Sequence, residues 1–175
     1  TKIMNGENFS NKNQRIINGI SANSYFLNKY NFYCGITSSF SNVPYAGGSY
    51  IGKNIVITAA HVVYKTNNVN NIKVRFNKKN LYTKGLIFNV KKILIHQKYN
   101  HETLDNDIAL LFLDKNPINF NINKAFLPNN KLSNKIYNLN KPGIILGYGV
   151  TDFNTNNQPN QLKYSLIKIL NKNKV

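Results

Sequence analysis

The sequence predicts an all-β fold, and three observations support this class. Residues 55–58 (Ile-Val-Ile-Thr) form a short run of β-branched side chains, which favour strands. Residues 47–51 precede that run and are separated from it by a Gly-Lys-Asn turn, a spacing typical of a tight hairpin. Residues 86–96 alternate apolar side chains with lysine and asparagine, as in a strand with one buried face.

The other strands are expected between polar, asparagine-rich connections. They fall in residues 30–36, 72–76, 107–114, 142–148 and 161–170. Residues 38–44, 65–71 and 154–160 are rich in residues that favour turns and loops.

Composition excludes several classes of protein. A chain of 175 residues with 42% hydrophobic residues can bury a substantial core and is too apolar for a disordered protein. No apolar run approaches the length of a bilayer span, so we expect no membrane segment. The first residue is Thr1 rather than Met, which favours a chain processed or trimmed from a longer one.

The formal net charge of +17 has two interpretations. The lysines are scattered along the chain rather than gathered into one block, which favours a solvated basic surface. The alternative is non-specific, salt-dependent association with nucleic acid or another polyanion. No aromatic-interleaved basic motif sharpens this second interpretation.

His61 is the first candidate for chemistry. It follows the buried strand 55–58 directly after Ala59 and Ala60, whose small side chains would leave the ring free to face a cleft. Taken alone, His61 is an ordinary strand-end histidine. A second stretch, Asn-Asp-Ile-Ala-Leu-Leu at 106–111, places an acid before another apolar strand. Histidine followed by aspartate is two thirds of a Ser-His-Asp relay in the order His, Asp, Ser.

Two alternatives for the acid stay open. Asp107 could instead cap its strand by accepting hydrogen bonds from backbone N–H groups. Asp105 is a weaker rival for the catalytic role, because the apolar run begins directly after Asp107.

The chain resembles the trypsin/chymotrypsin-like serine proteases, through five motifs in the family's order. They are Arg15-Ile16-Ile17-Asn18-Gly19, Gly47-Gly48-Ser49-Tyr50-Ile51, Thr58-Ala59-Ala60-His61, Asp107-Ile108-Ala109-Leu110-Leu111 and Gly147-Tyr148-Gly149. The resemblance implies a complete first Greek-key β-barrel of a double barrel, plus the first strands of an incomplete second barrel. It divides the chain into a leader (1–15), a first barrel (16–124), and a linker with the beginning of the second barrel (125–175).

The resemblance also implies residue roles. His61 would be the general base and then the general acid, and Asp107 would orient it. Cleavage after Arg15 would free an amino terminus at Ile16. The family needs no cofactor and no metal for this chemistry, and its substrate is a polypeptide. His61, His96 and His101 lack the spacing of metal ligands, so we expect no metal site.

The nucleophile is the missing part of the resemblance. The family's serine lies in a Gly-Asp-Ser-Gly-Gly loop, and nothing of that form occurs here. Ser133 and Ser165 are the only serines after Asp107, and neither sits in a glycine-rich loop. Ser49 precedes a strand, lacks the last glycine of a nucleophile elbow, and is interpreted as structural.

Three accounts of the function follow. The chain is the amino-terminal portion of an active serine endopeptidase, or a truncated pseudoprotease reused for binding, or a barrel that displays a basic surface to polyanions. Two strands of a second barrel would leave unpaired edges. We therefore expect self-association or binding to a complementary chain.

Cysteine usage bears on the compartment. Cys34 is the only cysteine, so no intrachain disulfide can form, and its place in a strand favours a buried thiol. By the resemblance, Ala46 and Val62 occupy the positions of the bridge that usually holds the histidine loop. Family members are usually secreted, whereas the absence of disulfides favours an intracellular or particle-associated protein.

Overall fold

A computed structural model of the chain describes residues 19–138, 142–149 and 158–169. Strands dominate it. They are β1 (Ile20–Ser21), β2 (Tyr33–Ser38), β3 (Ala46–Gly52), β4 (Ile55–Thr58), β5 (Ile72–Phe76), β6 (Leu86–Ile95), β7 (Ala109–Leu113), β8 (Pro142–Gly147) and β9 (Lys163–Lys168). The α-helices are α1 (Ser24–Lys29) and α2 (Asn130–Asn138), and short 3₁₀ turns are η1 (Ala60–Val62), η2 (Val69–Asn71) and η3 (Pro117–Phe120).

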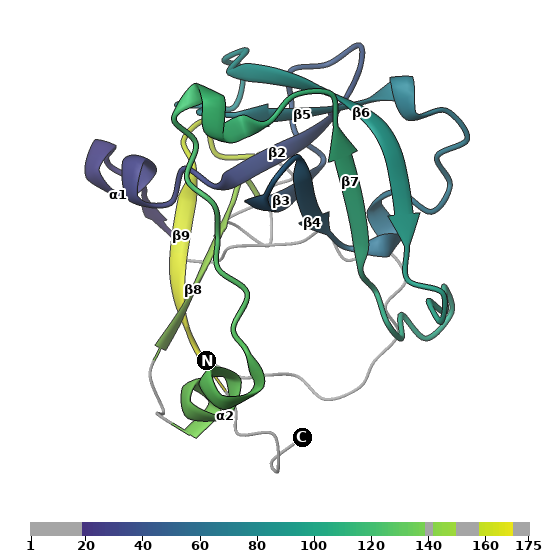
Figure 1. The fold of residues 1–175 in the computed structure, drawn as a ribbon. Helices are drawn as coiled ribbons and strands as arrows, with labels where there is room; N and C mark the ends of the chain where they lie inside the picture. Colours follow the sequence, from purple (N-terminus) through teal and green to yellow (C-terminus); the bar gives the residue numbers. More distant parts are fainter. Residues whose placement is uncertain (1–18, 139–141, 150–157, 170–175) are drawn as a thin grey trace.

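Six strands close into an antiparallel barrel in the order β2-β3-β4-β7-β6-β5 (Figure 1). The predicted hairpin is present, because β3 pairs with β4 across the Gly-Lys-Asn turn. The chain then leaves β4, crosses to β5 and β6, and returns so that β7 lies beside β4. This closed barrel confirms the predicted all-β class, and closure leaves none of its six strands as an open edge.

The barrel interior is filled by alternate side chains of its strands. Val56, Val74, Phe76 and Leu111 are each fully buried, as the period of two in a strand requires. Phe76 also contacts Phe88 edge to face, with ring centroids 5.3 Å apart, the geometry that aromatic pairs prefer. This core anchors β4 and β7, the two strands that lead to the candidate site.

A second, open sheet lies beside the barrel in the order β1-β9-β8. A small cluster of buried side chains, Leu81, Tyr148 and Leu162, joins it to the barrel. The Tyr148 hydroxyl also donates a hydrogen bond of 2.9 Å to the Lys78 carbonyl. Its strands β8 and β9 fall within the two stretches predicted as strands, 142–148 and 161–170. β1 pairs with β9 and comes from the amino-terminal side of the barrel.

The two α-helices were not predicted from the sequence. Asn23 caps α1, because its side chain accepts a hydrogen bond from the Phe26 backbone N–H. Asn129 does the same for α2 through the N–H of Leu132. Both are asparagine caps, and α2 lies in the segment that we interpreted as a linker. Neither helix, within the part of the chain that the structure describes, is long and apolar enough to cross a membrane.

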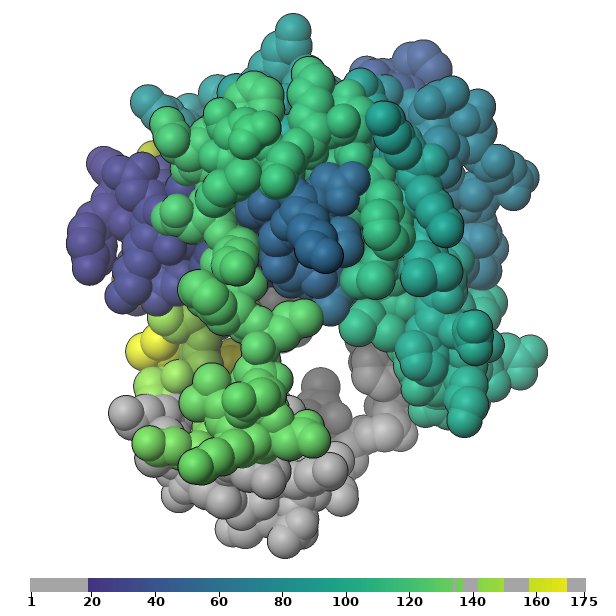
Figure 2. Space-filling view, in the orientation of Figure 1, coloured from purple at the N-terminus to yellow at the C-terminus, as the bar shows by residue number. Residues whose placement is uncertain are grey.

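The segment that follows the barrel leads to α2 and stands apart from it. Figure 2 shows α2, in green, below the barrel, with open space between it and the teal segment that precedes β7. Phe126 and Leu127, on the way to α2, are both exposed. The predicted linker therefore contains a helix and apolar side chains that the barrel does not cover.

Candidate active site

Two neighbouring strands bring His61 and Asp107 to one end of the barrel. β4 ends at Thr58, and η1, which carries His61, follows directly. Asp107 lies two residues before β7 begins at Ala109. Because Thr58 pairs with Ala109 in antiparallel register, the end of β4 and the start of β7 coincide (Figure 1). Residues 46 positions apart in sequence thus become neighbours.

Asp107 contacts His61 at two points. The ring Nδ1 of His61 lies 2.6 Å from Oδ2 of Asp107, and the backbone N–H of His61 donates to Oδ1 at 2.8 Å. A carboxylate that accepts two hydrogen bonds from one residue fixes both its backbone and its ring. The structure therefore combines the two alternatives for Asp107, backbone capping and a carboxylate aligned with the imidazole.

Both side chains of this pair are partly buried. The His61 side chain is 36% exposed and that of Asp107 is 22% exposed, so the ring is the more accessible partner. Burial acts to raise the pKa of Asp107, but the hydrogen bonds from the His61 ring and from the backbone of His61 and Ala60, together with the charge of His61, outweigh it. The net effect is a pKa below the usual value of 3.8. Asp107 is therefore ionised at neutral pH.

The ionised carboxylate determines which ring nitrogen of His61 carries the proton. A carboxylate only accepts hydrogen bonds, so in the neutral imidazole Nδ1 bears the hydrogen and Nε2 keeps its lone pair. None of the described residues donates a hydrogen bond to Nε2. Nε2 is therefore the basic atom of the site. Asp107 fixes the orientation of the ring through the other nitrogen, Nδ1.

The loop before β7 holds Asp107 in place through Asn106. Asn106 adopts a left-handed backbone with φ of 54°, a conformation that asparagine tolerates. Its side chain donates to the Lys98 carbonyl at 3.0 Å, and Ile108 accepts from the His96 N–H at 3.0 Å. This local turn directs the Asp107 carboxylate toward the backbone N–H and the ring of His61 in η1 rather than into solvent.

Asp105, the weaker rival, has a different partner. Its carboxylate accepts from the Thr103 hydroxyl at 2.9 Å, and the residue is exposed. Its backbone carbonyl accepts from the Asn100 N–H. Asp105 therefore closes the loop, and Asp107 alone of the two contacts His61.

An aromatic cluster beside the pair was missed by sequence reasoning. The Tyr64 hydroxyl lies 2.6 Å from Nε2 of His101, and Tyr99 packs edge to face against Tyr64 with centroids 5.9 Å apart. Burial, followed by the nearby charge of Asp107, raises the pKa of Tyr99. The sequence signal that could have indicated this cluster is the His-x-x-Tyr spacing of His96 and Tyr99.

The remaining candidate residues lie elsewhere. Ser133 is in α2 and Ser165 is paired with Ile145 between β9 and β8; among the described residues, neither forms a hydrogen bond with His61. Ser49 lies in β3 between its partners Tyr33 and Ile57. Arg15 and Ile16 fall outside the described residues. In the described ranges, no group of three His, Cys, Asp or Glu side chains is arranged to hold a metal ion.

The cysteine and its neighbourhood match expectation. Cys34 is buried in the barrel core, and burial raises the pKa of its thiol far above the ordinary value. Such a thiol stays protonated and is a poor nucleophile. Ala46 and Val62, which the resemblance assigns to the positions of the family's usual bridge, both pack against the same core.

Comparison with known proteins agrees with this architecture. A family model described as Trypsin matches residues 24–175. A trypsin of Simulium vittatum is 33% identical over 132 residues, which cover 75% of this chain and 51% of that protein. Hypodermin-A of Hypoderma lineatum is 32% identical over 130 residues, covering 74% and 49% respectively. The chain thus spans about half the length of these curated relatives.

A solved structure shares the fold. It is described as the crystal structure of scabies mite inactivated protease paralogue S-D1, with a TM-score of 0.72, 23% identity, and coverage of 91% of this chain and 64% of that chain. At this identity the likeness shows the fold alone.

Proposed function

We propose that this chain, which belongs to the trypsin family, supplies the histidine and aspartate of a serine endopeptidase that hydrolyses peptide bonds through an acyl-enzyme. The observation that carries the proposal is the two-point contact of Asp107 with His61, at 2.6 Å to the ring and 2.8 Å to the backbone. It leaves Nε2 as the basic atom, on the more exposed partner of the pair.

The proposed chemistry assigns one task to each residue. Nε2 of His61 takes the proton of a serine hydroxyl as its oxygen attacks the scissile carbonyl, and the imidazole becomes positively charged. Asp107 stabilises that charge without accepting the proton. His61 then gives the proton to the leaving amine. Water, activated by the same base, later hydrolyses the acyl-enzyme.

The nucleophilic serine is proposed to come from polypeptide outside these 175 residues. No Gly-Asp-Ser-Gly-Gly loop occurs among them. The apolar side chains of β8 and β9, including Ile144 and Leu166, are exposed, which favours a covering segment or partner. A complementary stretch of polypeptide that packs on β8 and β9 would bring its own serine and oxyanion donors. Without it, we expect the chain to be inactive.

Activation by cleavage extends the proposal. Arg15 precedes Ile16-Ile17-Asn18-Gly19, and an endopeptidase selective for basic residues would cut between Arg15 and Ile16. Limited digestion with trypsin, followed by amino-terminal sequencing, should yield a new terminus at Ile16. Preferential cutting at Lys12 or Lys29 instead would contradict this assignment.

Labelling with a fluorophosphonate tests the catalytic proposal. This reagent reacts with an activated serine, so the 175-residue chain alone should stay unlabelled, whereas a longer product of the same open reading frame should be labelled. A His61→Ala variant of the longer product is the control and should lose the label. Labelling of the short chain would show that it holds its own nucleophile. Absence of label in both would favour a pseudoprotease, the role that the name of the mite paralogue indicates for that protein.

A second candidate function rests on the charge. With 23 lysine and arginine residues against six acidic ones, the chain would attract polyanions by counterion release. Retention on immobilised DNA or heparin should weaken steeply as salt rises. Elution well below physiological salt would dismiss this function.

A further inference from the structure

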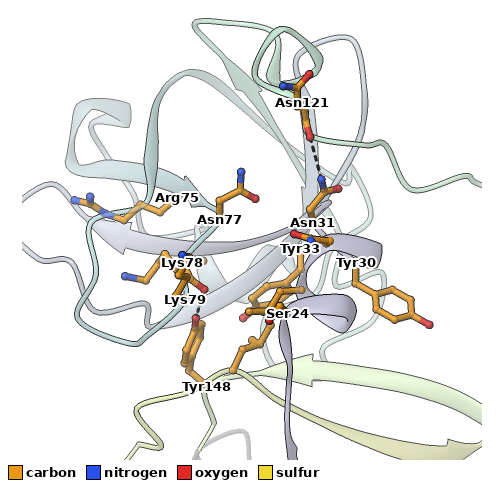
Figure 3. Close-up of a pocket in the computed structure, with 14 residues that line it drawn as sticks. Ser24, Tyr30, Asn31, Tyr33, Arg75, Asn77, Lys78, Lys79, Asn121 and Tyr148 are labelled. Atoms are coloured by element: carbon orange, nitrogen blue, oxygen red, sulfur yellow. Dashed lines mark hydrogen bonds between the residues drawn. The ribbon is translucent and has the colours of Figure 1, made fainter.

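A cavity of about 490 Å³ lies on the flank of the barrel, between α1, β2 and the segment that follows β5 (Figure 3). Arg75 and Lys78 contribute to its wall, but their charged ends donate hydrogen bonds to groups that do not line it. Neither His61 nor Asp107 lines it either. The cavity is therefore separate from the His61–Asp107 pair, and the side chains that support this pair belong to the aromatic cluster beside it.

A second side-chain contact joins the two segments that carry His61 and Asp107. Tyr64 lies in the same turn as His61, because its backbone N–H donates to the Ala60 carbonyl at 2.9 Å. His101 lies in the loop between β6 and β7, ahead of Asp107. The Tyr64 hydroxyl lies 2.6 Å from Nε2 of His101. The two segments are thus connected at two places, one of which is the His61–Asp107 pair itself.

The loop that carries His101 is closed by its own hydrogen bonds. The backbone N–H of Asn100 donates to the Asp105 carbonyl at 3.0 Å. The Asn100 side-chain oxygen accepts from the Glu102 N–H at 2.8 Å. These bonds lie on both sides of His101, so His101 and Asp107 belong to one hydrogen-bonded loop. A contact made by His101 therefore helps to set where Asp107 lies relative to η1.

Tyr99 supports the Tyr64–His101 contact from the barrel side. It is partly buried and packs against the barrel core, and its ring meets that of Tyr64 edge to face, with centroids 5.9 Å apart. Its hydroxyl lies 3.4 Å from Nδ1 of His101. A neutral imidazole carries one hydrogen, so Nε2 accepts from the Tyr64 hydroxyl when Nδ1 bears that hydrogen. The contact is therefore anchored on the core although His101 is exposed.

We propose that Tyr64 and His101 are positioning residues for the His61–Asp107 pair. The inference rests on the proposed endopeptidase function, and neither residue is proposed to touch the substrate or to carry the reacting proton. Their hydrogen bond holds the turn of His61 against the loop of Asp107. It thereby favours the His61 tautomer whose Nδ1–H donates to the carboxylate and whose Nε2 is basic. Without it, η1 and the loop separate more often, and the tautomer with hydrogen on Nε2 becomes more populated.

NMR of the nitrogen-15-labelled 175-residue chain tests this without a catalytic assay. At about pH 8.5, above the ordinary pKa of histidine, long-range ¹H–¹⁵N spectra distinguish the two neutral tautomers. Tyr64→Phe keeps the ring and removes the hydroxyl, and should raise the ratio of the Nε2–H to the Nδ1–H tautomer of His61 at least about threefold. Tyr82→Phe, at an exposed tyrosine, is the matched control and should leave this ratio unchanged. The wild-type ratio in Tyr64→Phe would overturn the proposal.

Variants of His101 test the acceptor. Glutamine can offer its side-chain oxygen to the Tyr64 hydroxyl near the position of Nε2, so His101→Gln should keep the wild-type tautomer ratio of His61. His101→Phe has no acceptor and should reproduce the effect of Tyr64→Phe. Combining Tyr64→Phe with His101→Phe should cause no further change, because both variants remove the same bond. Independent, additive changes would contradict a coupled pair.

The longer product of the same open reading frame separates this inference from the endopeptidase proposal. There, Tyr64→Phe should lower kcat about three- to tenfold and leave KM for a peptide substrate unchanged. A raised KM with unchanged kcat would indicate substrate contact and contradict a positioning role. A tautomer shift in a product that fluorophosphonate does not label would support the positioning pair and contradict the endopeptidase function. Labelling without a tautomer shift would support the function and overturn the pair.

Discussion

The backbone N–H of His61 and its ring Nδ1 contact the two different oxygens of the Asp107 carboxylate, at 2.8 Å and 2.6 Å. One side chain thereby holds η1 against the start of β7 and sets the tautomer of the imidazole. The structural contribution of Asp107 and its proposed catalytic contribution can therefore both be measured.

Asp107→Asn should abolish most endopeptidase activity of a product that includes the serine-containing segment. The asparagine amide can donate a hydrogen bond to Nδ1 and so favours the wrong tautomer of His61. We expect kcat to fall by about 10⁴, with KM for a peptide substrate little changed. Asp105→Asn is the control, because Asp105 contacts Thr103 and not His61. Equal losses in both variants would contradict the assignment of Asp107.

Acid should destabilise the chain through Asp107. Its pKa is below 3.8 in the folded state, so the unfolded chain binds its proton first as pH falls. The stabilisation is fully present above about pH 4 and is lost as pH drops through the lowered pKa. Urea unfolding between pH 5 and pH 2 should show a midpoint that falls, and Asp107→Asn should flatten the curve. Asp107 is one of six acidic residues in the chain, so only five others compete with this effect. An unchanged slope in the variant would refute it.

Tyr50→Phe should destabilise the barrel by about 1–2 kcal/mol. The Tyr50 hydroxyl lies between the Asn116 side-chain oxygen, at 2.6 Å, and the Lys53 carbonyl, at 3.2 Å, and its residue is fully buried. Its loss would remove the 2.6 Å hydrogen bond that the Asn116 side-chain oxygen accepts from this hydroxyl. Denaturant unfolding measures the change. Tyr25→Phe, at an exposed tyrosine, is the matched control and should be neutral.

Gly85→Ala and Gly85→Asn should both cost more than about 2 kcal/mol. Gly85 has a φ of 63°, and a Cβ there would lie 2.5 Å from the Phe76 carbonyl oxygen and 2.8 Å from Cγ of Lys78. If only the left-handed backbone mattered, asparagine would be tolerated better than alanine. Similar losses for both in thermal unfolding would identify the backbone contact as the cause. A neutral Asn variant would show that space is available.

Leu166→Lys should reduce self-association of the isolated chain. Leu166 is 61% exposed and pairs across β9 and β8 with Ile144, which is 39% exposed. Together they form apolar surface that water does not favour. Sedimentation velocity of the wild-type chain should show dimers or larger species that decrease in the variant. Leu94→Lys adds the same charge at an exposed leucine of β6 and should leave association unchanged. A monodisperse wild-type monomer would contradict the proposal.

Local sequence patterns predicted the barrel well and the second sheet less well. The β-branched run at β4, the Gly-Lys-Asn hairpin and the alternation in β6 are each short-range signals, and all three appear in the structure. β1 has only two residues, too few for any periodicity. α1 and α2 begin at asparagine caps in asparagine-rich segments, where the same residue also favours loops.

Sequence alone determined the chemical types at the candidate site, a histidine after one buried strand and an acid before another, and their order along the chain. It left open whether Asp105 or Asp107 meets the ring. Tertiary structure decided this, because antiparallel pairing of Thr58 with Ala109 places the Asp107 carboxylate on η1. The cavity lined by Arg75 and Lys78 was likewise invisible in the sequence, since its wall comes from α1, β2, β5 and the second sheet region. Only folding brings these four regions, which are distant in the sequence, together around one cavity.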